Sequence, residues 1–425
     1  MRFWHAVILA ILLPTGVAAA IIGRMTPAEP ITEARIARLP MGEQAAWTAY
    51  LARSHALMAA DKAALAEERA GGPAPESPPA GPSGGSGMPL DKAPEWYASP
   101  EARHVADVIV SFQTPAGGWG KNVNRSGPPR VRGQHYVPIE HLPANARSDI
   151  PGDEAWSYVG TIDNNATTTE IRFLVRVEAQ TDGPEGDLYR AAIVRGIFYL
   201  LDAQFPNGGW PQVFPLQGGY HDAITYNDDA ITDVIALLSS VAGRQGDYAG
   251  IPEPLAVQAK AAVDRAIALI LDTQVVIDGK RTIWGQQHDA LTTRPAGARN
   301  FEPASLSSYE SANLLSFLMR QPNPSPTLIA AVQDGVAWLE AHAIRGMEWK
   351  RGENGNWLSA RPGAGPIWSR YYDLATGKPV FGDRDKTIHD DPNELSLERR
   401  NGYSWFSAGP GKAIDQYAKW PYRRK

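Results

Sequence analysis

The chain has 425 residues, which is long enough for a large core and, by length alone, for more than one domain. Its net charge of −5 and pI near 6.0 argue against nucleic acid as a partner, because no face or tail is rich in Lys and Arg. The absence of cysteine excludes disulfides, zinc–thiolate sites and a cysteine nucleophile.

Residues 1–20 have the pattern of a secretory signal. Arg2 gives a positive start, residues 6–13 form an apolar run, and a stretch of alanines ending at Ala20 offers a cleavage site. The apolar run is too short to span a bilayer. We therefore predict a secreted or periplasmic protein that has no membrane partner once the signal has been removed.

Residues 21–70 are expected to form a small helical N-terminal segment, because apolar residues recur there at roughly helical spacing. Residues 71–89 consist mostly of Gly, Pro and Ser, a composition typical of a flexible linker. We therefore predict that residues 21–89 are separate from the unit at residues 90–425 and dispensable for its chemistry.

A pattern repeats along the rest of the chain. Four apolar helical segments end in Gln or His, at spacings of 91, 70 and 68 residues. These positions are Gln113, Gln204, Gln274 and His342, and the tryptophans that follow them are Trp119, Trp210, Trp284 and Trp349. The first two tryptophans close Gly-Gly-Trp turns, which we interpret as structural, with Gly ending a helix and Trp filling the core.

Polar loops and further apolar helices follow these turns, with helices expected near residues 167–180, 230–241 and 307–319. Such recurrence indicates repeated supersecondary units stacked around one core. Strand patterns are too short to build a sheet. The sequence therefore predicts an all-α fold, in which helical hairpins with long functional loops on one rim close into an α/α toroid.

Two polar turns, residues 161–167 and 225–231, run straight into apolar helices and carry Asp163 and Asp228. Asp at a helix start commonly caps free backbone N–H groups. Two related turns rich in carboxylate and amide oxygens can also converge on a hard cation such as Ca²⁺. Both interpretations are open from the residues alone.

Three later loops, residues 293–302, 367–373 and 381–385, carry Arg299, Arg370 and Arg384. A single loop arginine is usually a solvated or ion-paired surface group. Several arginines in Gly- and aromatic-rich loops indicate recognition of carboxylates, which the planar guanidinium binds through two hydrogen bonds. Acidic turns, Ca²⁺ and arginines together point to an acidic polysaccharide.

Short motifs between residues 94 and 410 occur in an order that resembles polysaccharide lyase family 10, the pectate lyases. They are Gln113-x-Pro-x-Gly-Gly-Trp119-x-Lys121-Asn122, Thr161-Ile162-Asp163-Asn164, Pro206-Asn207-Gly208-Gly209-Trp210-Pro211-Gln212, Tyr226-Asn227-Asp228, Gln287-His288-Asp289, Gly297-Ala298-Arg299 and Arg399-Arg400-Asn401-Gly402-Tyr403. The resemblance implies an (α/α)3 toroid and β-elimination on polygalacturonate. It leaves the N-terminal segment unexplained.

The resemblance also implies roles for particular residues. Asp163 and Asp228 match calcium ligands, and Arg299 matches the catalytic base of the family. Arg370 and Arg384 fall where the family binds substrate, and Lys121 and Asn122 are further substrate-binding candidates. One departure is Asp229, where relatives often have Asn. We expect a monomer that uses Ca²⁺ and binds polygalacturonate.

An arginine base conflicts with the usual chemistry of guanidinium, which stays protonated in proteins. Nearby Ca²⁺ and burial would both lower the pKa of Arg299. The alternative is that Arg299 only stabilises charge while water or another group takes the proton.

Two other functions compete with a lyase. An inverting glycoside hydrolase would use two separated carboxyl groups, for which Asp163 and Asp228 could serve. A non-catalytic glycan-binding protein would use the same residues for recognition alone. Elimination leaves an unsaturated, ultraviolet-absorbing sugar end, whereas hydrolysis and binding do not.

Overall fold

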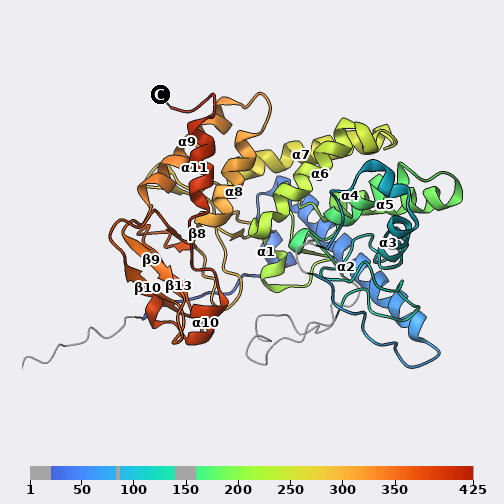
Figure 1. Cartoon of the computed structure of the whole chain (residues 1–425), viewed down its shortest axis with the longest axis horizontal. Coiled ribbons are helices and arrows are strands. Elements are labelled where there is room, and N and C mark those ends of the chain that lie inside the picture. The colour runs from blue at the N-terminus through green and yellow to red at the C-terminus, as the bar shows by residue number, and fades with distance from the viewer. Residues whose placement is uncertain (1–20, 83–86, 139–158, 425) are drawn as a thin grey trace, which may run out of the picture.

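The computed structural model describes residues 21–82, 87–138 and 159–424, and these are mainly helical (Figure 1). The predicted signal at residues 1–20 lies outside the described residues. Among the helices that are described, none combines the length and the apolar character needed to cross a membrane. The prediction of a helical protein is therefore confirmed in its coarse form.

Helices are the main regular structure of the described residues. In chain order they are α1 (Glu33–Ile36), α2 (Met41–Arg69), α3 (Pro100–Ser111), α4 (Thr168–Glu178), α5 (Gly183–Ala203), α6 (Ala230–Gly243), α7 (Glu253–Asp272), α8 (Ser308–Met319), α9 (Pro326–Ala341), α10 (Leu397–Gly402) and α11 (Pro410–Ala418). The helices expected near residues 167–180, 230–241 and 307–319 are thus confirmed as α4, α6 and α8.

Helices pack as successive pairs, α4 with α5, α6 with α7 and α8 with α9. Each pair contacts the next, because α4 touches α6, α5 touches α7, and α7 touches α9. α11 covers α8 and α9. In Figure 1 the α4–α7 pairs lie on one side of α8 and the C-terminal strands on the other.

The repeated Gln residues connect one pair to the next. The Nε2 atoms of Gln113, Gln204 and Gln274 each donate a 2.9 Å hydrogen bond to a carbonyl of the following long helix. The acceptors are Ala192 in α5, Ala262 in α7 and Ala331 in α9. Each Nε2 also donates at 2.8–2.9 Å to the carbonyl two residues before the repeated Trp. A shift of one helix pair along the next would therefore leave a buried N–H group without an acceptor.

The repeated Trp residues fill the core, as the structural interpretation predicts. Trp119, Trp210 and Trp284 are fully buried, and each indole N–H donates to a carbonyl near the end of the preceding helix at 2.6–2.7 Å. In the fourth unit this position belongs to Trp368, whose indole donates to Leu339 at 2.7 Å. The assignment of Trp349 to the repeat is wrong.

Short antiparallel ladders join the loops, which corrects the expectation that no sheet forms. They are the sheet β1–β14–β13 (Ile21–Arg24, Thr387–His389, Phe381–Gly382), and the pairs β2–β3 (Gly160–Thr161, Val213–Phe214), β4–β7 (Ile224–Thr225, Gln287–His288), β5–β6 (Val276–Ile277, Lys280–Arg281), β8–β12 (Leu306–Ser307, Tyr371–Tyr372), β9–β10 (Met347–Lys350, Trp357–Ala360) and β11–β15 (Trp368–Ser369, Phe406–Ser407). Most have only two residues per strand, which is too short for an alternating pattern to reveal.

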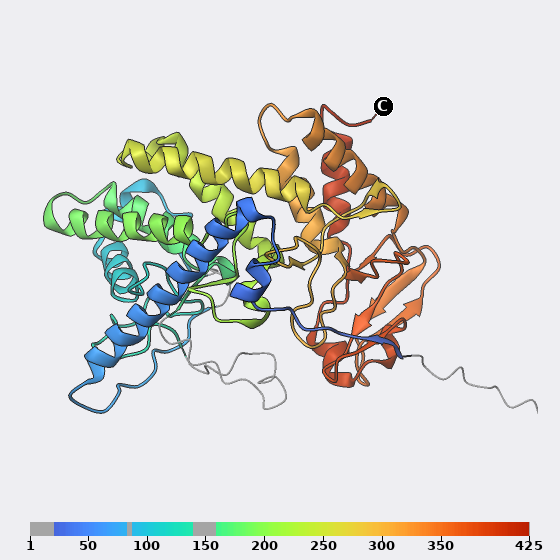
Figure 2. The same cartoon turned by 180° about the vertical axis from the view of Figure 1, so that it is seen from behind.

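The N-terminal segment is part of the same core, which corrects the expectation that it is separate. Trp47, Tyr50 and Leu51 of α2 belong to the main apolar cluster, and the Tyr50 hydroxyl donates to the carbonyl of Ala203 at 3.0 Å. Figure 2 shows α2 lying across this side of the helical region. The Gly/Pro-rich stretch is also attached, because Gly81 N–H donates to Asn122 O at 2.7 Å.

Asp61 makes this packing dependent on pH. It lies on α2 with 1% of its surface exposed, and burial raises its pKa to about 7, with a backbone contact at Ala116 opposing part of the shift. The folded state therefore holds the Asp61 proton more tightly than the unfolded state does. Between about pH 4 and 7 the folded state binds more protons, so stability falls as pH rises.

We predict that Asp61→Asn removes this loss, which corresponds to roughly 4 kcal/mol of unfolding free energy, because Asn carries no charge to bury. Urea unfolding at about pH 4.5 and pH 8 measures it. The variant should be more stable by only about 1 kcal/mol at the lower pH and by roughly 4 kcal/mol at the higher. Asp264→Asn, in an exposed ion pair with Lys260, is the control and should change little. Equal pH dependence in Asp61→Asn and wild type would contradict the account.

Candidate active site

Both acidic turns lie at helix starts. The 3₁₀ turn η3 (Asp163–Asn165) precedes α4, the turn η5 (Asn227–Asp229) precedes α6, and the two turns contact each other. The N-cap residues of the helices are Thr167 and Asp229, and neither makes a side-chain cap bond. Asp163 and Asp228 therefore do not cap these helices, and the capping interpretation is wrong for both.

Asp163 is a buried carboxylate held by a lysine. Its Oδ2 atom accepts from Lys121 Nζ at 2.8 Å. Burial would raise the pKa of Asp163, but the charge and hydrogen bond of Lys121, helped by Gln212, keep it below its usual range. Lys121 and Asn122 thus lie beside the first acidic turn, and Asn122 and Asn164 line one cavity of about 330 Å³.

Asp228 is exposed at the rim and carries a backbone φ of 49°, a left-handed conformation. Its Oδ2 accepts from Asn227 Nδ2 at 2.7 Å. Desolvation of the carboxylate by surrounding protein, then repulsion from Asp163 and Glu310, raises its pKa. A carboxylate crowded by two others is a donor set that an added cation would relieve.

Arg299 is paired with Glu302. Its Nε and Nη2 atoms donate to the two Glu302 oxygens at 2.9 and 2.6 Å, and its backbone N–H donates to the same carboxylate at 3.0 Å. The Arg299 side chain is 39% exposed and that of Glu302 only 3%. A half-open guanidinium therefore lies over a buried carboxylate.

This pair decides the charge of Arg299. Burial opposes the cation, but the Glu302 carboxylate outweighs that effect and holds the pKa of Arg299 well above its usual value. Burial likewise opposes ionisation of Glu302, whose pKa is nevertheless lowered to about 2, chiefly by Arg299. Burial thus acts on the pKa of Arg299 in the expected direction, but the Glu302 carboxylate, which the sequence analysis did not include, reverses the net shift.

Arg370 is paired with Glu310 in the same region. Its Nη2 atom donates to Glu310 Oε1 at 2.5 Å and to Asn227 Oδ1 at 3.3 Å, which ties it to the second acidic turn. The Arg370 side chain is 12% exposed and that of Glu310 only 1%. Ladder β8–β12 places the two residues together, because Glu310 follows β8 and Arg370 precedes β12.

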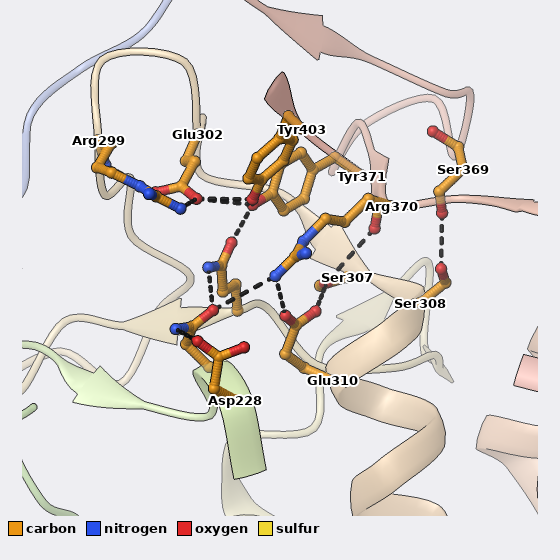
Figure 3. A network of polar contacts seen from close by, with 12 residues as sticks. Asp228, Arg299, Glu302, Ser307, Ser308, Glu310, Ser369, Arg370, Tyr371 and Tyr403 are labelled. Atoms are coloured by element: carbon orange, nitrogen blue, oxygen red, sulfur yellow. Dashed lines mark hydrogen bonds and ion pairs between the residues drawn. The ribbon is translucent and has the colours of Figure 1, made fainter. Parts of the chain in front are cut away.

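Hydroxyl and amide groups connect the two arginines (Figure 3). The Tyr403 hydroxyl donates to Glu302 at 2.6 Å and lies 2.5 Å from the Tyr371 hydroxyl. The Tyr371 hydroxyl in turn donates a hydrogen bond to Gln286 Oε1. The Gln286 amide donates to Asn227 at 2.6 Å. One hydrogen-bonded chain therefore runs from the Arg299 pair to the Asp228 turn.

Arg384 also reaches this region. The Arg384 guanidinium lies 4.7 Å from the centroid of the Phe301 ring, and the Arg299 guanidinium lies 4.9 Å from the same centroid. Arg384 forms a looser ion pair with Glu398 at 3.4 Å. The structure thus brings Arg299, Arg370 and Arg384 to one region, as the sequence suggests, and connects it to the acidic turns through Asn227.

Sequence reasoning missed several residues of this network: Gln286, Glu302, Glu310, Tyr371 and Tyr403. Glu302 follows Arg299 by three residues and Tyr403 ends a quoted motif, so their positions carried a signal. Glu310 lies in the first turn of α8, where acidic residues are common, so its position carries no functional signal. Within the described residues, no group of three or more His, Asp or Glu side chains forms a ready metal site.

Comparisons with known proteins place the chain among polysaccharide lyases. Residues 113–414 match the pectic acid lyase family. The structure is similar to a family 10 polysaccharide lyase from Cellvibrio cellulosa, with 31% identity, a TM-score of 0.64, and coverage of 79% of this chain and 98% of the other. A variant of a family 10 polysaccharide lyase from the same organism, solved with trigalacturonic acid, matches at 30% identity with the same TM-score and coverage. No curated protein sequence gives a significant match.

Proposed function

Because the chain belongs to the pectic acid lyase family, the family 10 polysaccharide lyases, we propose that it cleaves polygalacturonate by calcium-dependent β-elimination. The observation that carries this proposal is the cluster of Figure 3, where arginines held by buried carboxylates connect to an acidic turn. A related lyase solved with trigalacturonic acid supports an acidic polysaccharide as the substrate.

Elimination removes the proton at C5 of a uronate, next to its carboxylate. The electrons of the C5–H bond form the C4–C5 double bond, and the C4–O bond breaks with its electron pair on the leaving oxygen, which is then protonated. Negative charge grows on C5 and on the carboxylate before that bond breaks. Cations fixed there in advance stabilise this charge more than they stabilise bound substrate, and so speed the reaction.

Asp163 and Asp228 would hold Ca²⁺, together with oxygen atoms from the substrate. The carboxylate crowding at Asp228 fits a cation, and its exposure leaves the ion accessible to a uronate. Bound Ca²⁺ would supply positive charge at the uronate carboxylate. Arg370, Arg384, Lys121 and Asn122 would bind neighbouring carboxylates and hydroxyls of the chain.

Arg299 would act at C5. While it is paired with Glu302 it is a cation, and in that state it stabilises the developing carbanion while water or another group takes the proton. Arg299 could accept the proton itself only after the pair breaks, because Glu302 raises its pKa. We therefore assign it the role of the carbanion-side cation.

The stacked helix pairs would form the (α/α)3 toroid of the family, with residues 90–425 carrying the chemistry. Residues 1–20 would direct export to the periplasm or the medium, followed by the helical segment at 21–70 and the Gly/Pro-rich stretch at 71–89. The protein would act as a monomer.

We predict that polygalacturonate incubated with the protein gains ultraviolet absorbance, and that a calcium chelator abolishes the gain. Asp163→Ala and Asp228→Ala should each reduce turnover about 100-fold at low Ca²⁺, with a partial return of activity at high Ca²⁺. The exposed Asp264→Ala on α7 is the matched control. Chelator-resistant activity, or saturated reducing ends alone, would contradict the proposal.

We predict that Arg299→Ala lowers kcat about 100- to 1,000-fold while polygalacturonate still binds, because its contribution is made mainly in the transition state. Arg384→Ala should instead raise KM about tenfold, because we assign that arginine to substrate binding and not to the reacting carbon. Steady-state kinetics and equilibrium binding measure both effects. Near-normal kcat in Arg299→Ala would place the chemistry elsewhere.

A further inference from the structure

We propose that residues 21–36, called here the N-terminal strap, position the loops that carry Arg299 and Arg384. The strap precedes the part of the chain that matches the family, residues 113–414. Figure 2 shows it running from α1 to the C-terminal strands. The proposal rests on the proposed roles of the two arginines in catalysis.

The strap pairs with the hairpin that carries Arg384. β1 is hydrogen-bonded to β14, which in turn pairs with β13, and Arg384 lies in the turn between β13 and β14. Beyond β1, Met25 N–H donates to Lys386 O at 2.8 Å. The Arg24 guanidinium donates to Asp385 O at 3.3 Å. The strap is therefore joined to the hairpin at residues 385–389, directly after Arg384.

The strap also lies against the Gly297-Ala298-Arg299 loop. A methyl group added to Gly297 would lie 2.7 Å from the Thr26 carbonyl oxygen and 3.3 Å from the end of the Met25 side chain. Real side-chain atoms do not approach a backbone oxygen so closely, so only glycine leaves room for the strap here. Met25 is 5% exposed, which shows that the contact is closed to water.

Arg35 fastens the strap to the start of the same loop. Its Nη2 atom donates to Asp289 Oδ2 at 2.7 Å, and both side chains are 15% exposed. Its remaining nitrogens bind Glu29 and the carbonyl of Pro30 at 3.0 Å, which fixes the guanidinium on the strap side. Arg35 thus bridges two segments that are 254 residues apart.

Asp289 links Arg35 to the loop through its own hydrogen bonds to the loop backbone. Its Oδ1 atom accepts from the N–H groups of Leu291 and Thr292 at 3.1 and 2.8 Å, and its own N–H donates to Arg294 O at 2.8 Å. The residues that follow lead to Arg299, whose loop is closed by Ala298 N–H to Glu302 O at 2.9 Å. Holding Asp289 therefore holds the base of the Arg299 loop.

Loops of this kind have little regular structure of their own. Transition-state contacts, however, are lost when a side chain moves by as little as about 1 Å, so such loops need restraint from outside. The strap restrains both arginine loops from one side. Arg299 and Arg384 both contact the Phe301 ring, so a displacement of either loop would change the packing of the other arginine. Arg35 and Met25 are positioning residues in this account, because neither touches the proposed substrate.

The test compares the full-length Arg35→Ala variant with wild type by amide hydrogen exchange and by kinetics on polygalacturonate. We expect exchange at the Ala298 and Glu302 amides to accelerate at least about tenfold, and kcat to fall about tenfold. KM should rise less than kcat falls, because Arg35 holds the Arg299 loop directly and the Arg384 turn only through β1. Amides within α6 and α7 should exchange as in wild type. Arg38→Ala, at an exposed arginine two residues beyond the strap, is the matched control.

Two further variants keep the test decisive if Arg35→Ala is poorly folded. Arg35→Lys should recover part of the kcat, because it restores a charge next to Asp289 without the planar fork. Asp289→Asn keeps the oxygen that binds Leu291 and Thr292 but loses the charge that binds Arg35, and it should reproduce the Arg35→Ala result.

Unchanged kcat in Arg35→Ala would overturn the proposal, and so would faster exchange spread evenly over α6 and α7, since that reports general destabilisation. Absence of lyase activity in the wild-type protein is a different failure, because it refutes the proposed function. In that case the exchange data alone decide whether the strap holds the loop.

Discussion

The ion pair between Arg299 and Glu302 is the interaction on which the organisation of the site depends. Glu302 is almost fully buried, and a buried carboxylate is stable only when its charge and lone pairs are matched. Arg299 supplies three N–H donors and Tyr403 supplies a hydroxyl, so the match is close. The carboxylate therefore stays ionised across the neutral range and holds the guanidinium as a cation with one side open. Removing either partner would leave an uncompensated charge, and the Tyr403 chain to the second acidic turn would lose its anchor.

Charge is separated across this site in a way that suits a polyanionic substrate. Arg299 and Arg370 are paired with the buried carboxylates of Glu302 and Glu310, and part of each arginine side chain remains exposed. On the other side Asp228 suffers repulsion from two neighbouring carboxylates, which a bound cation would relieve. A uronate placed between them would meet positive charge on both sides of its carboxylate. The family match is what favours a lyase over an inverting hydrolase, because a raised pKa at Asp228 beside a lowered pKa at Asp163 would also suit hydrolysis.

Much of the helical framework was predictable from the sequence, because Gln113, Gln204 and Gln274 recur at helix ends and each is followed by a Trp. The recurrence has a physical cause: each Gln makes the same hydrogen bond to the following long helix. The fourth unit broke the pattern: Trp368 comes far later than the spacing suggests, so Trp349 was mistaken for it. Composition misled the interpretation of the N-terminal segment, since a Gly/Pro-rich stretch says nothing about whether the helix before it packs on the core. The two-residue ladders are too short to give a periodic pattern. No sequence pattern marks Glu310 either, because its burial against Arg370 depends on a residue 60 positions later.

The most direct test of the central claim, that Glu302 keeps Arg299 a cation beside the reacting carbon, is the pH dependence of kcat/KM for Glu302→Gln and wild type between about pH 6 and 11. Gln keeps the shape of the side chain but removes the charge that raises the pKa of Arg299. If Arg299 acts as a cation, the variant should be slower at every pH and its profile should keep the shape of the wild-type profile. If neutral Arg299 takes the proton, the lowered pKa would make the variant recover and overtake wild type as the pH rises, and that result would contradict the account.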